Sequence, residues 1–123
     1  MPHHFGRAAL PLLCLALAAS VTPARAEQAP SIQVGSDTRA KSVTECLKDA
    51  KFAITETGLS VTFTSGPHIG GAGTLRGTGA AVLVTCLEQG GRTFIEVVGT
   101  SLDGGAAEEA RNRVRTITMG PPS

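Results

Sequence analysis

The sequence contains no tryptophan and no tyrosine, and four phenylalanines are its whole aromatic content. It also lacks a long apolar run: residues 8–19 are interrupted by Pro11 and fall short of the roughly 20 residues that a membrane-spanning helix needs. Neither sign of charge dominates, since 11 basic residues face 10 acidic ones. The short apolar run disfavours a membrane span, and no apolar run of that length is found in the rest of the sequence. The balanced charge disfavours a nucleic-acid-binding surface. What remains, 41% hydrophobic and 17% charged residues, is typical of a folded domain.

The N-terminal residues have the organisation of an export signal. Residues 1–7 carry the amino terminus and Arg7, residues 8–19 are apolar, and Ala24-Arg25-Ala26 is a small-x-small cleavage site. We therefore predict a signal peptide over residues 1–26 and a periplasmic or secreted location. Cleavage leaves 97 residues with nine basic and ten acidic side chains, enough for one small domain.

Two cysteines remain after cleavage, Cys46 and Cys86. An even cysteine count in an oxidising compartment is typical of disulfides, so these two are predicted to pair. A redox pair or a metal site is the alternative. The forty positions between the cysteines and the lack of a Cys-x-x-Cys spacing disfavour both roles.

The segment 27–41 is predicted to be a flexible N-terminal tether. Its only sizeable apolar residues are Ile32 and Val34, so at most a short edge strand near residues 31–35 is expected. The compact domain is expected to cover residues 42–118.

An amphipathic helix is predicted to open this domain. Apolar residues recur at helical spacing from Val43 to Ile54. Ser42 and Glu45 have the spacing of a capping box, and Gly58 is a suitable stop. Cys46 lies on the apolar side of this helix.

Three strands and a second helix are predicted to follow. The strands are residues 59–64, 80–88 and 93–101, and the turn 89–92 makes the last two antiparallel. Asp103 can cap a helix that runs to about Thr118, and residues 119–123 are expected to be a frayed tail. The predicted fold is an α+β two-layer sandwich, with both helices on one face of a three-stranded antiparallel sheet.

The glycine-rich segment 66–79 is the first candidate site. Gly71, Gly73 and Gly77 are spaced as in dinucleotide-binding loops, but such loops open a helix and a strand is expected here. The segment also lacks the Gly-Lys-Ser/Thr of a phosphate-binding loop. We expect a mobile strand connection that can contact a ligand or partner, and we expect no cofactor.

His68 lies in this same segment and is the only histidine after cleavage. An imidazole can act as a base or a metal ligand, but no carboxylate is near it in the sequence and both cysteines are expected to be paired. A solvent-exposed role is therefore favoured over a catalytic one. The closing helix is predicted to carry a basic group, Arg111, Arg113 and Arg115. We interpret it as an ordinary charged helix surface, with a partner-binding patch as the alternative.

The strand at residues 80–88 is apolar on both faces. If Val82, Val84 and Cys86 face the helices, then Leu83 and Leu87 point away from them, together with Thr85. One of two pairs on the next strand joins them, either Phe94 with Val98 or Ile95 with Val97. An apolar face of this size needs a cover: a second copy of the chain, residues 27–41, or a partner or ligand.

The order of these features resembles small exported bacterial proteins of unknown function. The resemblance rests on an export signal, a helix with Thr44-Glu45-Cys46-Leu47, a glycine-rich segment, a strand with Leu83-Val84-Thr85-Cys86 and a closing helix. It spans about residues 42–118. It implies the cysteine pairing and the compact α+β domain, and no catalytic residue.

The function expected from the sequence is that of an exported, non-catalytic binding domain. It would bind a protein, an envelope component or a small apolar ligand through the open sheet face or the glycine-rich segment, and a homodimer is one such arrangement. The alternatives are a small enzyme or redox protein that uses His68 or the cysteines, and a passive envelope or stress protein.

Overall fold

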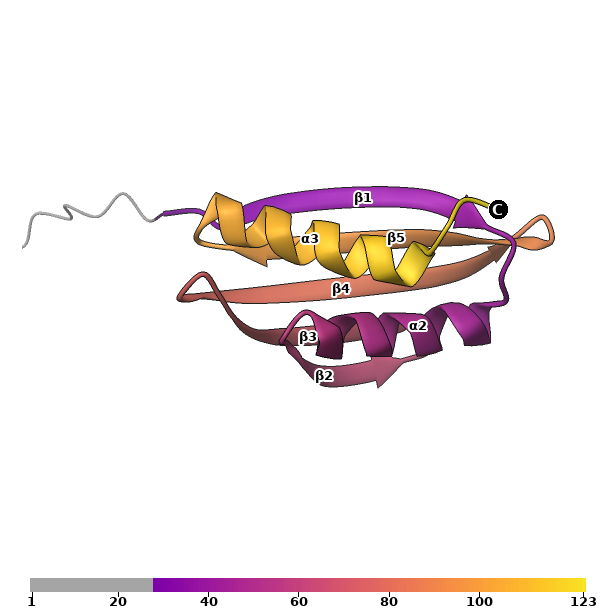
Figure 1. Ribbon diagram of the computed structural model, residues 1–123, viewed down its shortest axis with the longest axis horizontal. Coiled ribbons are helices and arrows are strands. Elements are labelled where there is room, and N and C mark those ends of the chain that lie inside the picture. Colours follow the sequence, from indigo (N-terminus) through magenta and orange to yellow (C-terminus); the bar gives the residue numbers. More distant parts are fainter. Residues whose placement is uncertain (1–27) are drawn as a thin grey trace, which may run out of the picture.

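The computed structural model describes residues 28–123, so the predicted export signal lies outside the described residues. A single antiparallel sheet has the strand order β1-β5-β4-β3-β2. Both helices lie on the same face of this sheet (Figure 1), which confirms the predicted α+β class. The elements are β1 (Ser31–Arg39), α2 (Val43–Glu56), β2 (Ser60–Ser65), β3 (His68–Leu75), β4 (Thr78–Gln89), β5 (Arg92–Ser101) and α3 (Gly104–Met119).

Helix α2 forms where the sequence predicts it. The Ser42 hydroxyl accepts a hydrogen bond from the backbone N–H of Glu45 at 3.1 Å, which satisfies one of the free donors at the helix start. The buried side of the helix consists of Cys46, Ala50, Ala53 and Ile54. Gly58 follows the helix with a φ of +87°, a conformation that glycine adopts without strain.

Helix α3 packs unusually close to the sheet because small residues meet there. The Asp103 carboxylate caps the helix by accepting from the N–H of Gly105 at 3.0 Å. The side of α3 that faces the sheet carries three fully buried alanines, Ala106, Ala107 and Ala110. A Cβ atom built on Gly99 of β5 would lie 2.5 Å from the carbonyl oxygen of Ala107, so only glycine allows this approach.

The segment predicted as a flexible tether is instead largely an edge strand. β1 pairs with β5 from Ser31 opposite Ser101 to Arg39 opposite Thr93, well beyond the short strand considered at residues 31–35. The alternation of apolar and polar residues is weak in β1, because the strand is held by backbone hydrogen bonds to β5 and not mainly by buried side chains. Of its side chains, Ile32 and Val34 are exposed.

The prediction of a mobile connection in the glycine-rich segment is also wrong. Residues 68–75 of this segment form strand β3. Its glycines make room for larger side chains from neighbouring elements. A Cβ on Gly71 would lie 2.5 Å from Cγ2 of Ile54, and a Cβ on Gly73 would lie 3.0 Å from Cδ2 of Leu59. The low strand propensity of glycine is therefore overridden by tertiary packing.

A disulfide between Cys46 and Cys86 confirms the predicted pairing. It joins α2 to β4 with a Cα–Cα distance of 6.2 Å, and both residues are completely buried. The core around it is aliphatic, with Ile54, Val84 and Ile95 among its largest fully buried side chains. The disulfide thus holds α2 against the central strand of the sheet.

The last residues of the chain do not extend freely, as a frayed tail would. The Ser123 hydroxyl accepts a hydrogen bond from the N–H of Ala40 at 2.8 Å, and the Ser123 carbonyl accepts from Arg92 at 2.5 Å. The tail therefore contacts the connection between β1 and α2 as well as the start of β5.

Candidate functional site: the outer sheet face

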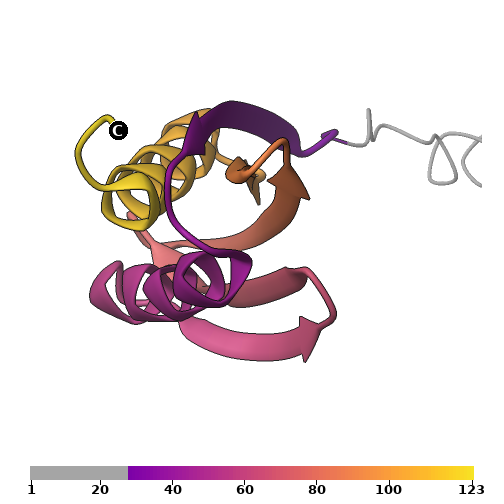
Figure 2. The same ribbon diagram turned by 90° about the vertical axis from the view of Figure 1, so that its right-hand side faces the viewer.

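The face of the sheet opposite the helices is the candidate site. Figure 2 shows both helices on one side of the sheet, and none of the elements in residues 28–123 covers the other side. Residues paired across an antiparallel sheet point to the same side, so the strand register defines which side chains share this face. We call this surface the outer sheet face.

A row of apolar positions crosses the outer sheet face on all five strands. It is continuous because each residue is paired in register with the next. We call it the apolar row: Val34 on β1, Val98 on β5, Leu83 on β4, Gly70 on β3 and Phe63 on β2.

The glycine in this row provides the place for the aromatic ring of its neighbour. A Cβ atom on Gly70 would collide with the ring of Phe63, so the ring occupies the space over Gly70 of β3. Phe63 is still 48% exposed, although it covers Gly70. The row therefore presents a continuous apolar surface rather than a gap at its fourth position.

Further apolar side chains extend the surface on both sides of the row. On one side Ile32, Ala81 and Ala72 belong to the next row, and at the other end of the sheet Leu87 pairs with Phe94. Ile32 is 64% exposed, Val34 50% and Leu87 44%. Exposed apolar side chains that adjoin one another mark interaction surfaces more often than scattered single ones do.

A polar row lies between the apolar row and the Leu87–Phe94 pair. Its members are, from β1 to β2, Ser36, Glu96, Thr85, His68 and Ser65. Nδ1 of His68 lies 2.9 Å from the hydroxyl oxygen of Thr85. Glu96 and His68 thus stand on either side of Thr85, one strand away from it in each direction.

The residues predicted to contact a ligand or partner separate into two groups. Leu83, Leu87 and His68 do lie on the outer sheet face. Gly71 and Gly73 face the helices and are covered by Ile54 and Leu59, so they cannot line this face. Gly77 is outside it too, in the β3–β4 turn with a φ of +74° and open space where its side chain would be.

Sequence reasoning missed four members of the face as site residues: Ile32, Val34, Phe63 and Glu96. Strict alternation over residues 59–64 would place Phe63 on the same face as Val61, which pairs with the helix-facing Gly71. A register irregularity between Val61 and Phe63 turns Phe63 to the outer face instead, and alternation within a strand does not contain this signal. Of the two pairs considered on β5, the structure places Phe94 and Val98 on the outer side and buries Ile95 and Val97.

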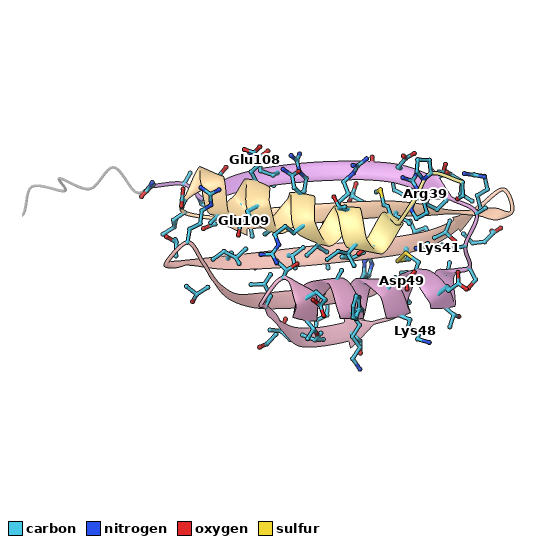
Figure 3. The ribbon with its side chains drawn as sticks, in the orientation of Figure 1. Arg39, Lys41, Lys48, Asp49, Glu108 and Glu109 are labelled. Carbon is cyan, nitrogen blue, oxygen red and sulfur yellow. A yellow bond between two sulfur atoms is a disulfide. The ribbon has the colours of Figure 1, made fainter. Side chains whose placement is uncertain are left out.

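The ion pairs of helices α2 and α3 lie on the helix side and at the ends of the molecule. Lys41 and Asp49 face one another at the C-terminal end of α3, with 2.7 Å between Nζ and Oδ2 (Figure 3). Glu109 contacts Arg76 at 3.2 Å and Arg113 at 3.8 Å. The predicted charged surface of α3 is thereby observed, with Arg113 directed at Glu109.

The edge of the sheet at β1 is bordered by arginines. Nη1 of Arg111 donates to the carbonyl oxygen of Val34 at 3.1 Å, and Nη1 of Arg39 donates to that of Thr38 at 2.9 Å. Charged side chains at a sheet edge discourage pairing with a further strand. The arginines therefore disfavour the addition of a further strand at β1.

The carboxyl of Asp37 on β1 has a lowered pKa. The hydrogen bond from Arg39, at 2.7 Å, and that from the N–H of Thr38, at 2.8 Å, lower the pKa of its carboxyl below the ordinary 3.8. A carboxyl whose pKa is lower in the folded state stabilises the fold above its unfolded-state pKa and loses that effect as the pH falls through the folded-state value. Asp37 is exposed, so the effect is expected to be small.

We expect the melting temperature of Asp37→Asn to lie slightly below that of the wild type at neutral pH. The difference should shrink as the pH falls below 3.8, because the carboxyl is protonated first in the unfolded chain and then, at the lower folded-state pKa, in the native protein. Thermal unfolding followed by circular dichroism between pH 2 and pH 7 measures it. A difference that stays constant or grows in acid would contradict this assignment.

Among residues 28–123, no group of three or more His, Cys, Asp or Glu side chains is arranged to hold a metal ion. No helix in that same range has the length and apolar character needed to cross a membrane.

Comparison with known proteins supports the fold. No protein-family model matches the sequence, and no curated protein matches it. Among solved structures, the chain is similar to CalU16 from Micromonospora echinospora, with a TM-score of 0.51 and 13% identity. The match covers 80% of this chain and 88% of CalU16. At this identity the likeness concerns the fold alone.

Proposed function

We propose that this chain is a small exported, non-catalytic domain that binds a protein partner through the outer sheet face. The observation that carries the proposal is the apolar row, which runs in register across five strands on a face that no described element covers. Burial of apolar area is the main favourable contribution to protein association. The periplasmic or secreted location follows from the N-terminal residues of the sequence.

The shape of the face favours a protein surface over a small ligand. Small molecules are bound in concave pockets that enclose most of their area. The hollow at this face, about 390 Å³, lies at one end of the sheet and includes Pro30, Ala72 and Leu102 in its lining. The apolar row itself crosses all five strands and does not line this hollow, so a second sheet surface fits it better than a small molecule does.

The chemistry of the polar side chains is consistent with binding. The sulfur atoms of Cys46 and Cys86 are bonded to each other in the core, which removes them as surface nucleophiles. Nδ1 of His68 is within hydrogen-bond distance of the Thr85 hydroxyl, an arrangement that orients the imidazole within the polar row. Both observations favour a structural and contact role for these residues.

Photo-cross-linking in cells that export the protein tests the proposal. A benzophenone amino acid replaces Leu87, which is 44% exposed on the outer sheet face, or Phe52, which is 59% exposed on α2. We expect covalent adducts from position 87 and far fewer from position 52, because only the first lies in the binding surface. Adducts from both positions alike, or from neither, would contradict the proposal.

A second substitution ties the adducts to the apolar row. Leu83→Asp places a charge at the centre of the row, and a charge is costly to bury against an apolar partner. It should abolish the adducts from position 87. Phe52→Asp, a matched change at an exposed apolar residue on the helix side, should leave them unchanged.

A further inference from the structure

We infer that the outer sheet face binds a second copy of the same chain, with the two faces packed together about a two-fold axis that runs parallel to β4. This inference rests on the proposed function and names the partner. It starts from the position of β4, which is the middle strand of the sheet order.

The symmetry follows from that central position. A two-fold axis lying between two facing sheets and parallel to β4 places β4 over the partner's β4. It places β5 over the partner's β3, and β1 over the partner's β2. Each cross-strand row then lies over the same row of the partner, because rotation about this axis does not shift positions along the strands.

The apolar row is complementary to itself in this arrangement. Leu83 lies opposite the partner's Leu83 at the axis. Gly70, which is covered by the ring of Phe63, lies opposite the partner's Val98, and Val34 lies opposite the partner's Phe63. Apolar side chains therefore meet apolar side chains along the whole row, as they do between packed sheets.

The polar row adds complementary hydrogen-bonding groups, because a carboxylate accepts and an imidazole N–H donates. Glu96 is its one carboxylate and His68 its one imidazole, and they lie on β5 and β3, the two strands that the axis exchanges. Each His68 consequently faces the partner's Glu96, and the pair occurs twice. Thr85 lies between them, opposite the partner's Thr85.

The contacts near the axis tolerate the twist of the sheets. Packed sheets cross at about −30°, which displaces residues on the outer strands more than those on the central strands. Leu83 and Thr85 lie on β4, and Glu96 and His68 lie one strand away. These four residues should therefore keep their partners.

The available area reaches that of a stable interface. Strands lie about 4.8 Å apart and rise about 3.4 Å per residue, so the face from Phe94 to Thr100 across all strands has a footprint of roughly 600 Å² with its side chains. Two copies would bury about 1,200 Å² or more, the lower limit for specific protein interfaces.

A charge-exchange experiment tests this geometry, with sedimentation velocity as the readout. Glu96→Lys places a positive side chain opposite His68, and His68→Glu places two carboxylates opposite each other. Each variant alone is expected to weaken the dimer about tenfold. In an equimolar mixture both cross-pairs become complementary, so a heterodimer should form with nearly wild-type affinity.

The controls separate loss of the interface from loss of the fold. Glu108→Lys changes an exposed carboxylate on α3, on the helix side, and should leave the dimer intact (Figure 3). Leu83→Asp should give a monomer. The thermal unfolding of each variant should show that it is folded at the temperature of the experiment.

The outcomes distinguish the two proposals. A folded wild-type chain that remains monomeric at high micromolar concentration, or a dimer indifferent to both charge changes and to their mixture, overturns the second-copy inference. If Leu83-dependent adducts to other proteins are then found at position 87, the proposed function stands without it. Adducts with the mass of two chains support both, and a monomer with no adducts overturns both.

Discussion

Removing the Cys46–Cys86 disulfide is expected to lower the free energy of unfolding by about 4 kcal/mol. The bond joins residues 40 positions apart, and chain-entropy arguments give roughly this value for a loop of that length. Small domains have only about 5–15 kcal/mol of stability in total, so the loss is a large share of it. Without the bond, α2 is held on β4 by packing alone.

The measurement compares the wild type with a Cys46→Ala/Cys86→Ala double variant by urea unfolding. The double variant avoids a free thiol, and alanine keeps both buried positions apolar. We expect the transition midpoint to fall strongly while the helix and strand signals in water remain. A change of less than about 1 kcal/mol would show that the loop is already restricted in the unfolded chain.

Replacing Gly99 with alanine is expected to be the most damaging glycine-to-alanine change in the sheet, because the added Cβ meets backbone atoms. The added Cβ would lie 2.5 Å from the carbonyl oxygen of Ala107 and 2.8 Å from the backbone nitrogen of Arg111. Both are backbone atoms of α3 and cannot rotate away, so the whole helix has to shift off β5. Overpacking of this kind costs about 1–3 kcal/mol or more.

Gly79→Ala is the matched control for this prediction. Gly79 is also a strand glycine, but a Cβ there meets nothing within 4 Å and its backbone needs no positive φ. Its unfolding midpoint should stay within about 0.5 kcal/mol of the wild type. Equal effects of the two substitutions would mean that loss of strand glycine itself, and not the approach of α3, determines the result.

The same close approach matters for the candidate site. α3 packs on β5 through Gly99, and the opposite side of β5 carries Val98 and Glu96. A shift of α3 therefore acts on the strand that supplies both an apolar and a charged contact. We expect substitutions at Gly99 to weaken binding at the outer sheet face as well as stability.

Local patterns were sufficient for the helices and for three of the strands, β2, β4 and β5. The spacing of Cys46, Ala50 and Ile54 together with the Ser42 cap specifies α2, and the glycine pair at 90–91 specifies the β4–β5 turn. These are signals within a few residues, where backbone preference and side-chain periodicity agree. The cysteine pairing was predictable too, since only two cysteines remain after the export signal.

The members of the outer sheet face were only partly predictable from the sequence. Leu83 and Leu87 were assigned to it because they alternate with Val82, Val84 and Cys86. Val34 and Phe63 were not, because their place in the same row depends on the register of β1 and β2, which pair with distant or glycine-rich strands. Register between strands is a long-range property that periodicity within a strand does not contain.

The sequence by itself therefore determined the two helices, the central hairpin, the disulfide and the α+β class. Tertiary structure alone decided that residues 31–39 and 68–75 are strands, because an edge strand is held by its partner's backbone and a glycine strand by the side chains that cover it. It also decided which apolar residues remain exposed. Ile54, Leu59 and α3 occupy one face of the sheet, and no element among residues 28–123 covers the five-membered row on the opposite face.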